Sequence, residues 1–485
     1  MRKLLLASAA IVGATGGVAF AQSSSPPVHP NQGQMAAPWA AGGYSTNDNN
    51  NVAAAAIKGA IATPTPGTVV IRLNGKVDTA ITASWGTGEN VPGSGKISPI
   101  GLNAYMRLYP GVDGLATNGL RYGAGIELRE NFGPANTTGN VQAGVNTQAT
   151  APSASSYDFS QTVYVRRAFV YLASDKAGLV RVGTTDGLIG LFDGAVTTSQ
   201  TWDFGIGQFN GGEAQAAGTT AGSAIPFVWL SLAGAEYDNA KIVYMTPQFY
   251  GFDFGVQYAP NMANNNAGAC NAAGPTCASL TAGADPTRWL NQVAAGVRYQ
   301  GVLGGVAVKT YAVYETAGKE SIAGGGFAAN GNLASQSAAG AVGLKYDNLS
   351  FVSAGAAFTY SGFTLAANYI GGALNGQLAM RPTGGAPENA VVVGLTYANG
   401  PWTLGVESGF VDSQGDVRLT KISQRHEWEM AFGGTYVVAP GVGLVAEYIH
   451  TERHQGGFNF VTGGAGVGTR DAHAQSLLFA TVVNW

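Results

Sequence analysis

From Thr68 to the end of the chain, hydrophobic and polar residues alternate with a period of two. The first such stretch places these apolar residues on one side: Val69, Ile71, Leu73, Val77, Ile81 and Trp85. It places these polar residues on the other: Arg72, Asn74, Lys76, Asp78, Thr82 and Ser84. The pattern recurs near 120–129, 252–258 and 293–300 and predicts β-strands with one apolar and one polar face. A sandwich with a wet outer face and a membrane barrel with a wet lumen both produce this alternation.

Aromatic residues near the ends of these stretches favour the barrel. They are Trp85, Tyr109, Tyr171, Tyr244, Phe252, Tyr258, Tyr299, Tyr360, Phe363, Tyr397, Trp402, Tyr436 and Tyr448. Rings at both ends of the strands form the two girdles that a membrane barrel places at the lipid interfaces. A sandwich has no need of aromatic residues at these positions.

The connections between the stretches alternate between short and long, as they do in bacterial barrels. Short links are expected at 174–178, 246–251, 301–305, 361–362, 398–401 and 439–441, with a medium one at 110–119. Long links are expected near 87–100, 133–157, 185–238, 260–290, 316–337, 372–387, 413–424 and 454–471. Scoring Ala339–Tyr346 and Phe351–Tyr360 separately gives seventeen strands and breaks the rhythm. Counting them as one element, interrupted at Asp347 and Asn348, predicts an all-β, sixteen-stranded antiparallel transmembrane β-barrel.

The two ends of the chain suggest the compartment. The C-terminal sequence AHAQSLLFATVVNW puts Leu477, Phe479 and Trp485 on one apolar face and stops on an aromatic ring. An exposed strand of this kind is an edge that soluble proteins avoid, whereas a closed barrel needs it to seal the seam. It resembles the terminal strand of Gram-negative outer-membrane proteins, in which the last aromatic residue is the signal for barrel insertion. The resemblance implies the barrel assembly machinery, outer-membrane lipids and lipopolysaccharide as partners.

The N-terminal segment has the features of a secretory signal. Residues 1–21 combine Arg2 and Lys3 with an apolar stretch and an Ala19-Phe20-Ala21 cleavage pattern, which predicts a signal peptide. Residues 22–66 are rich in Ser, Pro, Asn, Gly and Ala, so we expect a disordered or loosely attached periplasmic extension. The barrel is then expected to occupy residues 67–485.

Composition and charge exclude some classes of function. Only 11% of residues are charged, whereas soluble proteins average about 25%. Removing Arg2 and Lys3 leaves 23 basic and 28 acidic residues, a charge of −5, and no basic stripe for nucleic acid is visible. Cys270 and Cys277 lie in one Gly- and Ala-rich stretch of an exported chain, so a disulfide between them is possible, with two free thiols as the alternative.

The longest loop, 185–239, is the candidate for narrowing the lumen. It carries only acidic charges: Asp186, Asp193, Asp203, Glu213, Glu236 and Asp238. The preceding strands carry basic residues, of which alternation places most in the lumen: Arg72, Lys76, Arg107, Arg121, Arg129, Arg166, Arg167 and Arg181. An inward-folded loop would set acids against a basic wall, creating a transverse field that orients polar solutes. The charge of −5 and the acidic loop together predict a weak preference for cations. The alternative is that the arginines simply pair with neighbouring carboxylates.

Three segments carry a more specific resemblance. VRVGTTDGLIGLFDG (180–194) and TTSQTWDFG (197–205) resemble the fifth strand and inward third loop of alphaproteobacterial general diffusion porins, and KIVYMTPQFYGFDFGVQY (241–258) resembles the next hairpin. The resemblance implies a trimeric porin of the Gram-negative outer membrane that passes small hydrophilic solutes without a cofactor. It places Asp193, Asp203 and Glu213 on the acidic loop of the constriction. Opposite them it implies a basic wall of these residues: Arg72, Arg107, Arg121 and Arg181.

Three rival functions remain at this point. An outer-membrane enzyme would need a nucleophile–base pair or paired carboxylates, and no such motif is evident, so we expect no enzyme activity. His450, Glu452 and His454 share one strand face, but such a trio is more often a solvated strand end, so we expect no metal site. A substrate-specific channel, for example for sugars, would need aromatic residues along the lumen, and a plugged barrel could serve as a structural anchor or adhesin.

Overall fold

The computed structural model describes residues 64–87, 100–131, 163–174, 176–193, 239–261, 289–319, 346–375, 381–416, 419, 421–460, 464–466, 468 and 470–485. Within these ranges, no helix combines the length and the hydrophobicity needed to cross a lipid bilayer. The predicted signal peptide and the pair Cys270 and Cys277 lie outside the described residues, as does the predicted extension up to residue 63.

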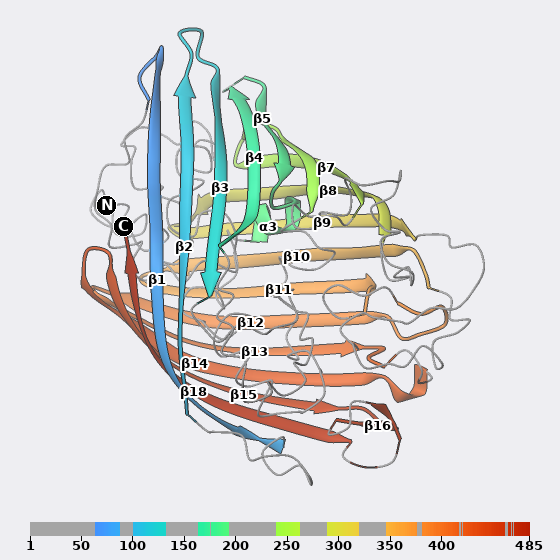
Figure 1. Ribbon diagram of the computed structural model, residues 1–485. Helices are drawn as coiled ribbons and strands as arrows, with labels where there is room; N and C mark the ends of the chain where they lie inside the picture. The colour runs from blue at the N-terminus through green and yellow to red at the C-terminus, as the bar shows by residue number, and fades with distance from the viewer. Residues whose placement is uncertain are drawn as a thin grey trace, which may run out of the picture.

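Sixteen antiparallel strands close into a barrel (Figure 1). The first eight are β1 Thr68–Gly86, β2 Ile100–Leu115, β3 Arg121–Asn131, β4 Tyr164–Ser174, β5 Gly178–Thr184, β6 Ala240–Met245, β7 Phe252–Asn261 and β8 Trp289–Leu303. The others are β9 Val306–Lys319, β10 Leu349–Tyr360, β11 Phe363–Ala373, β12 Glu388–Asn399, β13 Trp402–Ser413, β14 Arg425–Ala439, β15 Val442–His454 and β18 Asp471–Asn484. The shorter elements are α3 Leu188–Asp193, η8 Lys421–Ser423, β16 Phe458–Asn459 and β17 Gly464–Ala465. The predicted fold class and strand number are therefore confirmed.

The seam of the barrel is closed by the last strand. β18 pairs antiparallel with β1 from Lys76 opposite Asn484 to Gly86 opposite Ala474. The backbones of Gly75 and Trp485 then exchange two hydrogen bonds of 3.1 Å each, N–H to carbonyl oxygen. Because both edges of the sheet are paired in this way, neither is left exposed along the seam.

The short and long connections alternate as predicted. Short connections join seven pairs of consecutive strands: β2–β3, β4–β5, β6–β7, β8–β9, β10–β11, β12–β13 and β14–β15. Gly304 and Gly305 have φ of 57° and 87°, which a two-residue hairpin turn of the primed type requires. Two boundaries were predicted wrongly. β2 continues to Leu115, inside the link expected at 110–119. β10 begins at Leu349, whereas Tyr346 forms an isolated bridge with Pro382 on another connection. Residues 339–345, the rest of that predicted element, lie outside the described ranges.

The two faces of the wall differ in polarity. Outward side chains are mostly large and apolar, and Ile71 and Leu102 are 80% and 78% exposed. Inward side chains such as Arg107, Arg167 and Glu315 are fully buried. At the short-turn end, aromatic pairs pack across neighbouring strands: Phe252–Tyr299, Phe363–Tyr397 and Trp402–Tyr436, with ring centroids 4.8, 4.5 and 4.5 Å apart. This is the inverted polarity of a membrane barrel, apolar toward lipid and polar toward the lumen.

Candidate functional site

The start of the longest loop packs against the inner wall. α3 follows β5 directly and contacts β7, β8, β9 and β10, and Figure 1 shows it on the inside of the strands. Leu188, Ile189 and Phe192 of this helix are fully buried. Gly255 on β7 makes the approach possible, because a Cβ there would overlap the side chain of Leu188. Gly296 on β8 leaves room for the helix too, since a Cβ there would make a tight contact, 3.2 Å, with the ring of Phe192.

Polar contacts fix α3 in this position. The backbone N–H of Leu188 donates to Oε1 of Gln257 over 2.6 Å. Arg298 on β8 donates to both carboxylate oxygens of Asp253 (3.1 and 2.6 Å) and to the carbonyl oxygen of Leu191 over 3.3 Å. Its guanidinium also lies 4.9 Å from the centroid of the Phe192 ring, within the range of a cation–π contact. Residues 194–238, which complete the loop, lie outside the described residues.

Asp186, just before α3, joins a buried cluster of charges. Nη2 of Arg167 lies 3.0 Å from Oδ1 of Asp186, and Nη1 of Arg167 lies 2.8 Å from Oε2 of Glu127. Burial raises the pKa of Asp186 to about 6, although Arg167, Arg181 and Lys241 act in the opposite direction. Asp186 is therefore an acidic residue at the start of the loop that faces basic side chains and can change charge near neutral pH.

The four arginines expected in the basic wall all lie on the inner face of β1, β2, β3 and β5. Nη2 of Arg72 lies 3.2 Å from Oδ2 of Asp113, whose other oxygen accepts a hydrogen bond from the Tyr171 hydroxyl. Arg107 is fully buried opposite Lys76. The guanidinium of Arg181 lies 4.9 Å from the Phe169 ring. Arg121 follows on β3, paired with Leu115 and Ala173 across the sheet.

The acidic half of the expected constriction is described only at its beginning. Asp193 is the last residue of α3, and nothing of its side chain is described. Asp203 and Glu213 lie outside the described residues. Their position opposite the basic wall therefore stays a prediction. Arg167 and Asp186, which the predicted constriction did not include, form an ion pair. The position of Asp186 directly after the fifth strand could have indicated its role.

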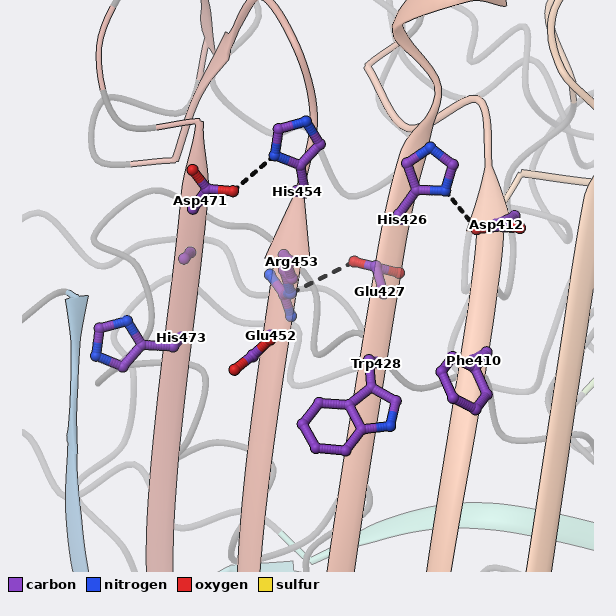
Figure 2. Close-up of a pocket in the computed structure, with 11 residues that line it drawn as sticks. Phe410, Asp412, His426, Glu427, Trp428, Glu452, Arg453, His454, Asp471 and His473 are labelled. Atoms are coloured by element: carbon purple, nitrogen blue, oxygen red, sulfur yellow. Dashed lines mark hydrogen bonds and ion pairs between the residues drawn. The ribbon is translucent and has the colours of Figure 1, made fainter.

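A second group of polar residues lies on the outer face, at the loop ends of β13, β14, β15 and β18 (Figure 2). A row across these strands reads Asp412, His426, His454 and Asp471, each directly opposite the next. Nδ1 of His426 lies 2.6 Å from Asp412, and Nδ1 of His454 lies 2.6 Å from Asp471. Figure 2 shows the two imidazoles turned away from each other, each toward its own aspartate.

This outer group borders a cavity of about 580 Å³ that Phe410 and Trp428 also line. Two residues of the trio noted in the sequence lie on the same outer face, where Nε2 of His450 is 2.9 Å from Oε1 of Glu452. No three His, Cys, Asp or Glu side chains in the described ranges are arranged to hold a metal ion. The group faces away from the lumen, so we do not assign it to the solute path.

Comparison with known proteins agrees with the fold. A sequence model of the family described as Gram-negative porin matches residues 7–456. The anion-selective porin from Comamonas acidovorans has a similar structure, with 17% sequence identity, 86% of this chain and 100% of that chain covered, and a TM-score of 0.50. An OmpT loop-deletion mutant from Vibrio cholerae aligns at 10% identity over 86% and 99% of the two chains with a TM-score of 0.47. A variant of Rh. blastica porin aligns at 12% identity over 86% and 100%, with a TM-score of 0.44.

No curated protein sequence matches the chain. The family match nevertheless spans nearly the whole chain, and the sixteen-stranded closed barrel agrees with it. The chain therefore belongs to the Gram-negative porin family, and it is an outer-membrane β-barrel that forms a channel for passive diffusion.

Proposed function

We propose that the channel is water-filled and passes small hydrophilic solutes and ions without catalysis. The observation that carries this proposal is the charge of the inner face. Arg72, Arg107, Arg181 and Lys241 all point inward, while the outer face of the same strands is apolar. A lumen lined by charged groups favours solutes that keep their polar contacts and disfavours apolar ones.

We further propose that α3 begins the segment that narrows this passage. The hydrogen bonds that hold α3 on β7 and β8, from Arg298 and to Gln257, support this proposal. In this proposal Asp193, Asp203 and Glu213 face a basic wall of the following residues: Arg72, Arg107, Arg121 and Arg181. The ion pair of Asp186 and Arg167 contributes to the transverse field at the point where the loop leaves the wall.

A size series of neutral sugars tests this function. The purified full chain is reconstituted in liposomes, and swelling is followed as monosaccharides, disaccharides and larger oligosaccharides are added outside. A passive channel predicts swelling rates that fall steeply with solute size and do not saturate with concentration. Saturation with one sugar would instead favour a substrate-specific channel. Liposomes that contain folded barrels and admit no solute would favour a plugged anchor.

The quaternary state is proposed from the outer face of β1 and β2. The exposed large hydrophobic residues described there are all aliphatic, and four of them have the highest exposure: Ile71, Leu73, Ile100 and Leu102. On the other strands aromatic residues such as Phe252, Phe363 and Trp402 accompany the exposed aliphatic residues, as expected where lipid interfaces are met.

We therefore propose that this aliphatic face packs against other copies of the chain in a homotrimer. Cross-linking in detergent and in vesicles should give a trimer band. Replacing Ile71 and Leu102 with Arg should reduce the protein to monomers with folded barrels. A wild-type chain that stays monomeric in vesicles would contradict the proposal.

A further inference from the structure

Three consecutive long connections are joined to one another by buried hydrogen bonds. They are the β11–β12, β13–β14 and β15–β18 connections, which follow one another around the long-loop end of the barrel. The side chains that join them are those of Asn375, Gln414 and Gln455, which are 8%, 0% and 0% exposed. We call these three side chains the loop clamp. None of them belongs to the predicted constriction.

Gln455 joins the last two of these connections. Its Nε2 donates to the backbone carbonyl oxygens of Gln414 and Ser423 over 2.9 and 2.8 Å. Its Oε1 accepts from the backbone N–H of Asp416 over 3.2 Å and from Nε of Arg425 over 3.0 Å. A primary amide offers two donors and two acceptor lone pairs, so every hydrogen-bonding position of this buried amide is used. One side chain therefore fixes the β15–β18 connection to the β13–β14 connection.

The other two side chains of the clamp join the β13–β14 connection to the β11–β12 connection. Nδ2 of Asn375 donates to the carbonyl oxygen of Gly415 over 3.0 Å, and Oδ1 of Asn375 accepts from the N–H of the same glycine over 2.8 Å. Oε1 of Gln414 accepts from the N–H of Ala386 over 2.8 Å. Gln414 thus contacts both neighbouring connections, since its backbone carbonyl oxygen is one that Gln455 binds.

The packing around Gln455 leaves little room for another arrangement. Gly415 has a φ of 66°, and a Cβ there would lie 2.6 Å from Oε1 of Gln455. The guanidinium of Arg425 lies 4.8 and 5.3 Å from the ring centroids of Phe458 and Phe460, within the range of cation–π contacts. A buried polar group that loses its partner is costly, so we expect the clamp to open as a unit and not bond by bond.

Two glycines, Gly456 and Gly457, directly follow Gln455 in the chain, and Gly457 has a φ of 78°. Glycine has no Cβ, so its backbone can adopt many conformations. The backbone at this point therefore allows the β15–β18 connection to pivot. The hydrogen bonds of Gln455 are what fix the direction in which that connection leaves β15.

We propose that the β11–β12, β13–β14 and β15–β18 connections form one cooperative body at the outer mouth of the channel, with Gln455 as its latch. While the latch is closed, the body stays in one position and gives the mouth one fixed shape. When the latch opens, the β15–β18 connection pivots at Gly456 and Gly457, and the other two connections lose their fixed positions with it. The effect on conduction rests on the proposed water-filled channel, whereas the cooperativity of the body does not.

Hydrogen exchange of individual backbone amides in the folded full-length protein tests the cooperativity. Gln455→Leu keeps a side chain of similar size that cannot form hydrogen bonds. The reporters are the N–H groups of Ala386 and Gly415, whose hydrogen bonds go to the other two side chains of the clamp. The matched control is Gln475→Leu, because Gln475 is half-buried on the outer face of β18 and accepts a hydrogen bond from Tyr448. Folding of each variant is checked by the mobility of unheated samples on gels.

A cooperative body predicts that Gln455→Leu accelerates exchange at both reporters by about tenfold or more, because losing these buried hydrogen bonds shifts the opening equilibrium by at least that factor. The reciprocal variant Asn375→Ala should accelerate exchange at the N–H of Asp416, which is bonded to Gln455. Gln475→Leu should leave exchange at all three amides unchanged. Faster exchange in Gln455→Leu at Asp416 alone would overturn the proposed body. If Gln455→Leu does not fold, Gln455→Glu makes the same predictions, because it keeps the acceptors of the latch and loses both donors.

Planar-bilayer recording tests the effect on conduction. The wild-type protein should show one open level for each barrel, whereas Gln455→Leu should add partial levels as the unlatched connections move at the mouth. Faster exchange at both reporters with wild-type current levels would overturn the role of the latch in conduction. A folded wild-type protein without any conductance would contradict the proposed function, and the exchange rates would then still decide whether the body is cooperative.

Discussion

Removing one ring should release α3 from the inner wall. Phe192 is fully buried beside Gly255 and Gly296 and the guanidinium of Arg298, which lies 4.9 Å from the ring centroid. Phe192→Ala deletes this ring but leaves the ladder of backbone hydrogen bonds between β7 and β8 intact. We therefore expect a folded barrel with a poorly held helix.

The magnitude follows from the burial of the ring. Truncating a buried Phe to Ala costs about 3 to 5 kcal/mol when the surroundings cannot collapse into the space. A cation–π contact of this kind adds roughly 0.5 to 2 kcal/mol. Since about 1.4 kcal/mol corresponds to a tenfold change in an equilibrium constant, the ratio of attached to detached α3 should fall roughly 100-fold or more.

Single-channel recording in a planar bilayer measures the consequence. A helix that detaches and returns should raise the open-channel current noise and broaden the distribution of unitary conductance. The control is Phe358→Ala, which removes the same ring from the outer face of β10, where it is 47% exposed. Wild-type noise and conductance in a folded Phe192→Ala barrel would refute the idea that this contact holds the helix.

Three further predictions follow from single residues. Burial raises the pKa of Asp186 to about 6, so lowering the pH from 7 to 5 should protonate it. The basic wall then gains net positive charge, and the zero-current potential should show a lower permeability of K⁺ relative to Cl⁻. Asp186→Asn should abolish this part of the pH dependence. Arg167→Leu removes the arginine that Glu127 and Asp186 share, so the free energy of unfolding should fall by about 3 to 5 kcal/mol. The folded form should then be lost from gels at a lower heating temperature than in the wild type. Gly75→Val places side-chain atoms where the Trp485 ring lies, so the barrel should fold more slowly into vesicles. An unchanged folding rate would show that this contact is not needed to close the barrel.

The strands were predictable because their signal is local. Alternation of period two fixes which side chains share a face within one strand, and the connection lengths fix how many strands the chain makes. The outward position of Ile71 and the inward position of Arg107 both follow from this alone. The same rule failed near Tyr346, where an apolar alternating stretch precedes β10 but Tyr346 itself bridges to Pro382.

The arrangement of charges across strands could not be predicted in this way. Arg166 and Arg167 are adjacent, and only pairing with β3, which has an irregular register at Glu127 and Leu128, determines that Arg167 points inward. The packing of α3 on Gly255 and Gly296 depends on residues far along the chain, so no local pattern predicted it.

Conductance of the purified full chain in a planar bilayer with KCl tests the central claim most directly. A water-filled porin predicts large stepwise increases in current, each proportional to the salt concentration. A trimer further predicts that each step closes in three equal parts. A bilayer that stays silent, with barrels shown to be folded and inserted, would contradict the passive channel.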